Sequence, residues 1–95
     1  MTGTVRSSAE LDIRRRRARF RSWHRGTREM DLVLGRFADS DLSRLTPEEL
    51  DQYEALLEVP DTELFKWVTG EKAVPSAYDT PLFARIAQGS RAQQD

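Results

Sequence analysis

A short polar segment in the first third of the chain combines a glycine with arginines and carboxylates. Five such residues fall within seven positions: Arg25, Gly26, Arg28, Glu29 and Asp31. Gly26 suits the end of one helix and the cap of the next, and Glu29 and Asp31 suit a first helical turn, where the helix dipole favours carboxylates. A glycine also lets another protein's backbone approach closely, while exposed guanidinium groups bind that protein's carboxylates. The segment therefore predicts either an ordinary helix boundary or a protein docking site.

An arginine-rich run precedes this segment, with six arginines between residues 14 and 21. Such a run is found in proteins that bind nucleic-acid phosphates or an anionic membrane surface. It is also typical of a solvated helix face, or of an electrostatic docking face for an acidic protein. The chain as a whole is not basic, and neither a helix-turn-helix pattern nor an aromatic stacking platform accompanies the run. We therefore favour the last two interpretations and keep a small nucleic-acid-binding or regulatory module as the alternative.

Residues that could carry catalysis or hold a metal are scarce. The chain has no Cys, and His24 is its only His. Disulfides, thiolate metal sites and cysteine nucleophiles are thereby excluded, and His24 has no suitably spaced partners for a zinc site or a catalytic triad. The neighbouring carboxylates at 48, 49, 51 and 54 belong to an early helical turn that favours acids. We expect no catalytic, metal-binding or cofactor-binding residue, and no enzyme.

The length of 95 residues allows one domain with one modest core. No window approaches the ~18 apolar residues that cross a bilayer, and the N-terminus does not resemble a signal peptide. We expect a soluble intracellular protein that does not insert into membranes. Charge is uneven, because residues 1–36 carry a net charge of +6 and residues 37–95 a net charge of −7. A dipolar surface is expected.

The apolar spacing predicts an all-α fold, a compact five-helix bundle in a single domain. Period-2 alternation is nowhere sustained, which argues against strands. The expected segments are a flexible tail at 1–7, helices at 8–24, 27–40, 47–59, 61–68 and 80–89, and a flexible tail at 90–95. Asp61 is expected to cap the fourth helix, and Gly89 to end the fifth.

The third helix has the clearest start. Thr46, Pro47 and Glu49 match a capping box with proline at the first helical position. Leu45 and Leu50 are placed to pack together as a hydrophobic staple. Core side chains are expected on the second, third and fourth helices: Met30, Val33, Leu34, Phe37, Leu50, Tyr53, Leu56, Leu57, Leu64, Phe65, Trp67 and Val68.

Two blocks of the sequence resemble one known family. Residues 19–31, RFRSWHRGTREMD, resemble the Arg-Gly-x-x-Glu signature of the FAD assembly factors of succinate dehydrogenase, the SdhE family. Residues 56–67, LLEVPDTELFKW, are similar to the second block of that family, a Leu-Leu-Glu followed by Asp and then Leu-Phe-x-Trp. The blocks occur in the family's order and spacing, and the resemblance spans about residues 14–89.

The resemblance implies a five-helix bundle that binds the flavoprotein subunit of succinate dehydrogenase, and in some bacteria that of fumarate reductase. Such a factor promotes covalent attachment of FAD to a histidine of that subunit, so FAD belongs to the partner and no stably bound cofactor is expected. The second block is implied to be mainly structural. The docking surface that the resemblance implies comprises Arg21, His24, Arg25, Gly26, Arg28, Glu29 and Asp31. We expect a free monomer in the bacterial cytoplasm, or in the mitochondrial matrix if the source is eukaryotic.

Overall fold

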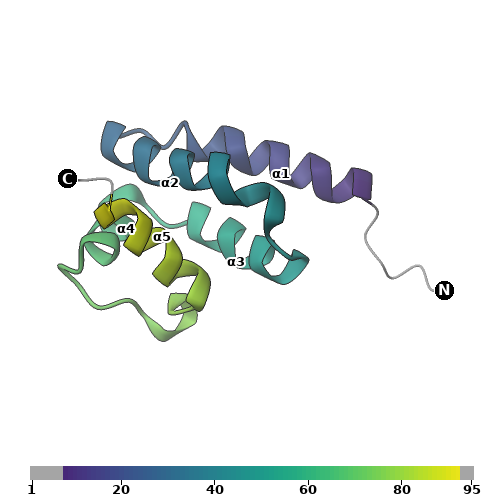
Figure 1. The fold of residues 1–95 in the computed structure, drawn as a ribbon. Coiled ribbons are helices and arrows are strands. Elements are labelled where there is room, and N and C mark those ends of the chain that lie inside the picture. Colours follow the sequence, from purple (N-terminus) through teal and green to yellow (C-terminus); the bar gives the residue numbers. More distant parts are fainter. Residues whose placement is uncertain (1–7, 93–95) are drawn as a thin grey trace.

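The computed structural model describes residues 8–92, which form five α-helices and two short 3₁₀ segments (Figure 1). Their bounds are α1 Ser8–Ser22, α2 Arg28–Asp41, η1 Leu42–Arg44, α3 Pro47–Leu57, α4 Asp61–Thr69, η2 Ser76–Tyr78 and α5 Pro81–Ala92. No strand occurs within residues 8–92. The predicted all-α, five-helix bundle is confirmed.

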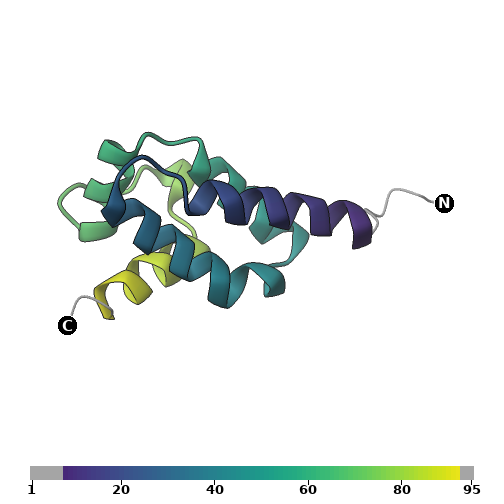
Figure 2. The same ribbon diagram turned by 90° about the horizontal axis from the view of Figure 1, so that it is seen from above.

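Helices α1 and α2 lie side by side and antiparallel, and α3, α4 and α5 lie across from them (Figures 1 and 2). α1 packs on α2 and α3, while α5 contacts α2, α3 and α4. The predicted core of α3 is fully buried, and α2 buries Met30 and Leu34, with Val33 and Phe37 packed at the core's edge. By contrast, the only buried side chains of α1 are the small ones of Ala18 and Ser22, among residues 9–22. Apolar burial therefore holds α1 only weakly.

Ion pairs join α1 to α3 and to the residue that follows α3. Arg14 Nη2 lies 2.6 Å from Asp51 Oδ1 and 2.7 Å from Glu54 Oε1, and Arg21 Nη2 lies 2.5 Å from Glu58 Oε2. The hydrogen bond to Glu54 raises the pKa of the Arg14 guanidinium above its ordinary value. Partly exposed pairs of this kind contribute about 0–1 kcal/mol each, so they orient α1 more than they stabilise it. The sequence's charge asymmetry is thus partly neutralised inside the fold.

Two buried hydroxyl groups link α1, α2 and α3. Ser22 Oγ lies 2.7 Å from the Ala18 carbonyl oxygen and 2.6 Å from Tyr53 Oη, which lies 3.1 Å from the Leu34 carbonyl oxygen. Since each hydroxyl carries one hydrogen, two hydrogens serve three contacts, and the shorter two suit Ser22 donating to Ala18 and Tyr53 donating to Ser22. Burial raises the pKa of Tyr53 to about 12.

Gly35 in α2 makes room for the indole of Trp23, which lies at the corner between α1 and α2. A Cβ atom at Gly35 would lie 2.3 Å from the ring of Trp23, so no larger residue fits without movement of the indole. Trp23 Nε1 donates to Asp39 Oδ1 at 3.3 Å. The glycine at position 35 is therefore explained by the packing of the Trp23 indole on α2.

The start of α3 has the hydrogen bonds of the capping box that the sequence predicts. Thr46 Oγ1 accepts the Glu49 amide at 3.1 Å, and Glu49 Oε1 accepts the Thr46 amide at 3.0 Å. Leu45 and Leu50 are both buried, as a hydrophobic staple requires. The predicted capping box is confirmed.

Several predicted boundaries are wrong. α1 ends at Ser22 rather than at residue 24, and Thr27 rather than Gly26 is the N-cap of α2, its hydroxyl accepting the Met30 amide at 3.3 Å. α5 continues through Gly89 to residue 92, because Gly89 does not adopt the positive φ of a glycine that ends a helix. The C-terminal tail predicted from residue 90 therefore begins too early, since Ser90 is helical and buried. Residues 1–7 and 93–95 of the predicted tails lie outside the described residues.

Candidate docking site

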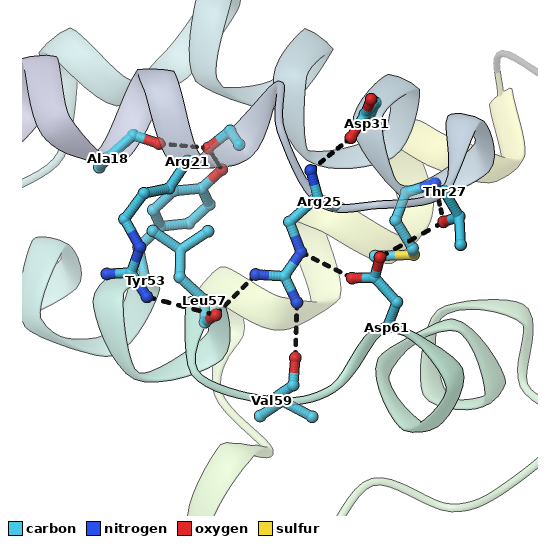
Figure 3. A network of polar contacts seen from close by, with 11 residues as sticks. Ala18, Arg21, Arg25, Thr27, Asp31, Tyr53, Leu57, Val59 and Asp61 are labelled. Atoms are coloured by element: carbon cyan, nitrogen blue, oxygen red, sulfur yellow. Dashed lines mark hydrogen bonds and ion pairs between the residues drawn. The ribbon is translucent and has the colours of Figure 1, made fainter.

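Arg25, at the corner between α1 and α2, turns its side chain into the molecule (Figure 3). Its Nε donates to Asp61 Oδ1 at 2.7 Å, its Nη1 to the Leu57 carbonyl at 2.6 Å, and its Nη2 to the Val59 carbonyl at 2.5 Å. The side chain is only 8% exposed. It satisfies carbonyl groups at the C-terminal end of α3 that have no helical partner. The expectation of an exposed guanidinium at Arg25 is wrong.

Asp61 joins the two sequence blocks by pairing with Arg25, which lies 36 residues before it. One carboxylate oxygen accepts from Arg25 and the other lies 3.4 Å from Thr27 Oγ1, and the side chain is 12% exposed. Asp61 is the first residue of α4, whose N-cap is Pro60 without a side-chain cap. The predicted capping role of Asp61 is therefore wrong, because its carboxylate pairs with Arg25 instead. Losing one partner of so buried a pair costs about 3–5 kcal/mol.

Gly26 is exposed and has a φ of 113°, a conformation that favours glycine. A Cβ atom there would lie 3.7 Å from Asp61 Oδ2, an ordinary contact, so the backbone conformation rather than lack of space requires glycine. Asp31 stabilises the turn from the other side, where its Oδ1 accepts the Arg25 amide at 2.6 Å. Asp31 is half-buried, and the structure places it in the turn rather than on the open face.

Arg28 and Glu29, by contrast, point outward from the first turn of α2. Both are exposed, and neither makes a hydrogen bond or ion pair with any residue between 8 and 92. Glu29 lies in the first turn of α2, as the sequence predicts. This pair therefore leaves opposite charges open beside Gly26, as a docking surface requires.

The remaining predicted residues flank the corner, Arg21 on α1 and His24 just beyond its end. His24 is exposed, stacks on Phe20 with ring centroids 3.9 Å apart, and has Nδ1 2.6 Å from the Phe20 carbonyl oxygen. Arg21 is exposed but is held by Glu58. Of the seven predicted residues, which all gather at this corner, five are therefore exposed: Arg21, His24, Gly26, Arg28 and Glu29.

A groove beside the corner was not predicted from the sequence. It runs between the start of α2 and α4, and we call it the α2–α4 groove; its lining residues are Thr27, Glu29, Asp61, Thr62, Phe65, Lys66 and Glu71. Phe65 is half-buried here, whereas Leu64, Trp67 and Val68 are buried. A signal for this existed, because Leu64, Trp67 and Val68 fall within about 100° of the helix circumference and Phe65 lies outside that arc.

The arginine run mostly serves the fold. Four of its six members are engaged: Arg14, Arg15, Arg19 and Arg21 contact carboxylates, and Arg15 also donates to the Leu45 carbonyl. This engagement supports the interpretation of the run as a packed and solvated helix face. Arg16 and Arg17 are exposed and make no hydrogen bond or ion pair with the described part of the chain.

Neither a metal site nor a membrane-spanning element is found in the described part of the chain. No cluster of three or more His, Asp or Glu side chains there could hold a metal ion. None of the helices between residues 8 and 92 has both the length and the apolar character to cross a membrane.

Comparisons with known proteins point in one direction. Residues 16–90 match the family model of Sdh5, described as the flavinator of succinate dehydrogenase. The "FAD assembly factor SdhE" of Acetobacter pasteurianus is 42% identical over 81 residues, which cover 85% of this chain and 74% of that protein.

Mitochondrial proteins named "succinate dehydrogenase assembly factor 2" are also similar. The protein of Debaryomyces hansenii is 42% identical over 64 residues, 67% of this chain and 45% of that protein. The protein of Dictyostelium discoideum is 35% identical over 78 residues, 82% of this chain and 55% of that protein. The chain thus spans about three quarters of the bacterial relative and about half of these mitochondrial ones.

Proposed function

The chain belongs to the Sdh5 family of succinate dehydrogenase flavinators, and we propose that it binds the flavoprotein subunit of succinate dehydrogenase and promotes covalent attachment of FAD to it. The names of its relatives support this role. The observation that carries the docking site is the Arg28–Glu29 pair, exposed and without partners at a corner that Arg25 and Asp61 hold in place.

Each motif residue takes a separate task in this proposal. Arg28 and Glu29 bind charged groups of the flavoprotein, and Gly26 lets its backbone approach. Arg25 and Asp31 are positioning residues, since their contacts lie within the corner. Because the corner is anchored to α3 and α4, little order has to be gained on binding, and that favours affinity.

The factor acts by differential affinity rather than by chemistry of its own. It binds the flavoprotein conformation that holds the flavin and the acceptor histidine in attack geometry better than it binds other conformations. The bond then forms within the partner, and no residue of this chain has to touch the reacting atoms. We propose the bacterial cytoplasm as the site of action, or the mitochondrial matrix if the source is eukaryotic.

FAD remains with the partner in this proposal. The α2–α4 groove is lined by the carboxylates of Glu29 and Glu71 and by Asp61, which is paired with Arg25, and Lys66 is the one lysine in its lining. Such a set of charges repels the diphosphate of FAD. The same groove suits a partner side chain that is apolar enough to contact Phe65.

Glu29→Ala tests the proposal, with Glu48→Ala as a matched control. Both glutamates occupy the second position of a helix capped by a threonine, both are exposed, and neither has an intramolecular partner in residues 8–92. We expect both variants to keep the wild-type free energy of unfolding within about 0.5 kcal/mol. Glu29→Ala alone should weaken binding to the purified flavoprotein subunit by about tenfold or more, as for a residue worth over 1.4 kcal/mol at an interface.

The readouts are calorimetric titration and flavin fluorescence of the flavoprotein after a denaturing gel. Equal affinity and equal covalent flavin with both variants would contradict the proposal. Gly26 is a less informative position, because any side chain there also strains the backbone.

A further inference from the structure

One face of α1 remains uncovered by the rest of the fold. Ile13, Arg17 and Phe20 are spaced by four and three residues, which places them on one side of α1, and His24, two residues beyond the end of that helix, stacks on Phe20. Ile13 and Phe20 lie opposite the side that buries Ala18, whereas Arg17 lies at the edge of this face, where it also lines a groove with Arg14 and Arg21. We call these four residues the outer stripe of α1.

The outer stripe is apolar where a solvent-facing stripe is usually polar. Ile13 is 42% exposed and Phe20 is 63% exposed, and both of the exposed large apolar side chains in the described part of the chain lie here. Single exposed apolar residues are ordinary, so what distinguishes this face is that both of them gather on it. The ring of His24 is stacked on Phe20 with an interplanar angle of 17°, so the two rings form an ordered platform. An ordered aromatic platform loses little entropy when a partner covers it.

Free positive charge lies on the same face. Arg17 belongs to the stripe and Arg16 flanks it, and neither makes an ion pair or hydrogen bond with residues 8–92. Arg14 and Arg21, on the side toward α3, are instead occupied by its carboxylates. The uncovered face of α1 is therefore an apolar platform beside unpaired guanidinium groups, complementary to an acidic surface with an apolar side chain at its centre.

The outer stripe runs directly into the docking corner. His24 at its end lies two residues before Gly26, and Arg28 continues the unpaired positive charge beyond the corner. We propose that the outer stripe is a second contact for the same flavoprotein subunit, receiving an acidic surface patch whose central apolar side chain packs on the Phe20–His24 platform. This inference rests on the proposed function, because it takes the flavoprotein as the partner.

The test compares Phe20→Ala and Arg17→Glu with two matched variants. Phe20→Tyr keeps the aromatic ring, and Arg44→Glu makes the same charge change at an arginine that is 72% exposed in η1. We expect Phe20→Ala and Arg17→Glu each to weaken binding to the flavoprotein subunit by about tenfold. Phe20→Tyr and Arg44→Glu should stay within about twofold of the wild type. Because Phe20 is largely exposed, the midpoint of thermal unfolding of Phe20→Ala should lie within about 3 °C of the wild type.

The outcomes separate this inference from the function on which it rests. If Glu29→Ala loses binding while Phe20→Ala and Arg17→Glu bind like the wild type, the second contact is overturned and the docking corner stands. If the unmodified chain does not bind the flavoprotein subunit, the proposed function fails and the second contact fails with it. Binding of duplex RNA or phosphatidylglycerol vesicles that Arg17→Glu abolishes, with flavoprotein affinity unchanged, would also overturn it.

Discussion

Arg25 and Arg28 are three residues apart in the chain, yet one is sealed inside the fold and the other is open to solvent. Arg25 donates to Asp61 and to two carbonyl groups, whereas Arg28 makes no hydrogen bond or ion pair with any residue between 8 and 92. Arg14 and Arg17 repeat this division on α1, since Arg14 is held by α3 and Arg17 is unpaired. Identical side chains in one short segment therefore have different roles. Arg25 holds the corner in shape, and Arg28 is available to a partner.

We expect the largest difference in the free energy of unfolding between substitutions of Arg25 and of Arg28. Arg25→Ala should lower the free energy of unfolding by about 3–5 kcal/mol, because it leaves the Asp61 carboxylate buried without its partner. Arg28→Ala should change it by less than about 0.5 kcal/mol. Urea denaturation followed by circular dichroism measures both.

A double-mutant cycle sharpens this contrast. When Arg25→Ala and Asp61→Ala are combined, neither charge is left stranded, so the loss should be smaller than the sum of the single losses. Additive losses would show that the Arg25–Asp61 pair does not join the corner to α4.

Alkaline pH should destabilise the fold through the buried hydroxyl group of Tyr53. Burial raises the pKa of Tyr53 to about 12, from 10.0 for an unperturbed tyrosine. The stabilisation is thus complete below about pH 10 and is lost as the pH rises toward 12, with a loss of roughly 3 kcal/mol. Comparison with Tyr53→Phe by denaturation from pH 8 to about 12 isolates this loss, and parallel curves for the two proteins would refute it.

Alanine substitutions at two glycines should change the free energy of unfolding in opposite directions. Gly26→Ala forces a Cβ into a backbone with a φ of 113° and should cost about 1–2 kcal/mol. Gly89→Ala lies in α5, where a Cβ meets nothing within 4 Å, and should add about 0.5–1 kcal/mol. Thermal unfolding tests both, and a stabilised Gly26→Ala would contradict the strained turn.

Local chemistry explains which parts of the fold could be predicted. The capping box of Thr46 and Glu49 involves residues three apart, and the stripe that contains Met30 and Leu34 repeats at helical spacing, so short-range patterns define both. The five helices and the position of the corner follow from such patterns.

Contacts between distant segments explain what could not be predicted. Arg25 turns inward because carbonyl groups and a carboxylate more than 30 residues away lie beneath it, and no local pattern contains that information. In the sequence, Gly89 resembled a glycine that ends a helix. Its φ is not positive in the structure, so α5 continues through it. The α2–α4 groove likewise depends on two helices that the sequence does not place beside each other.

The indole of Trp23 rests on the backbone of α2 because Gly35 has no side chain, and it lies two residues from Arg25. The chain's other indole, at Trp67, is buried. A Trp67→Phe protein would therefore carry one half-exposed fluorophore beside the corner. Its emission wavelength would depend on the solvent exposure of that surface, so binding of a partner there could be followed by intrinsic tryptophan fluorescence without an attached dye.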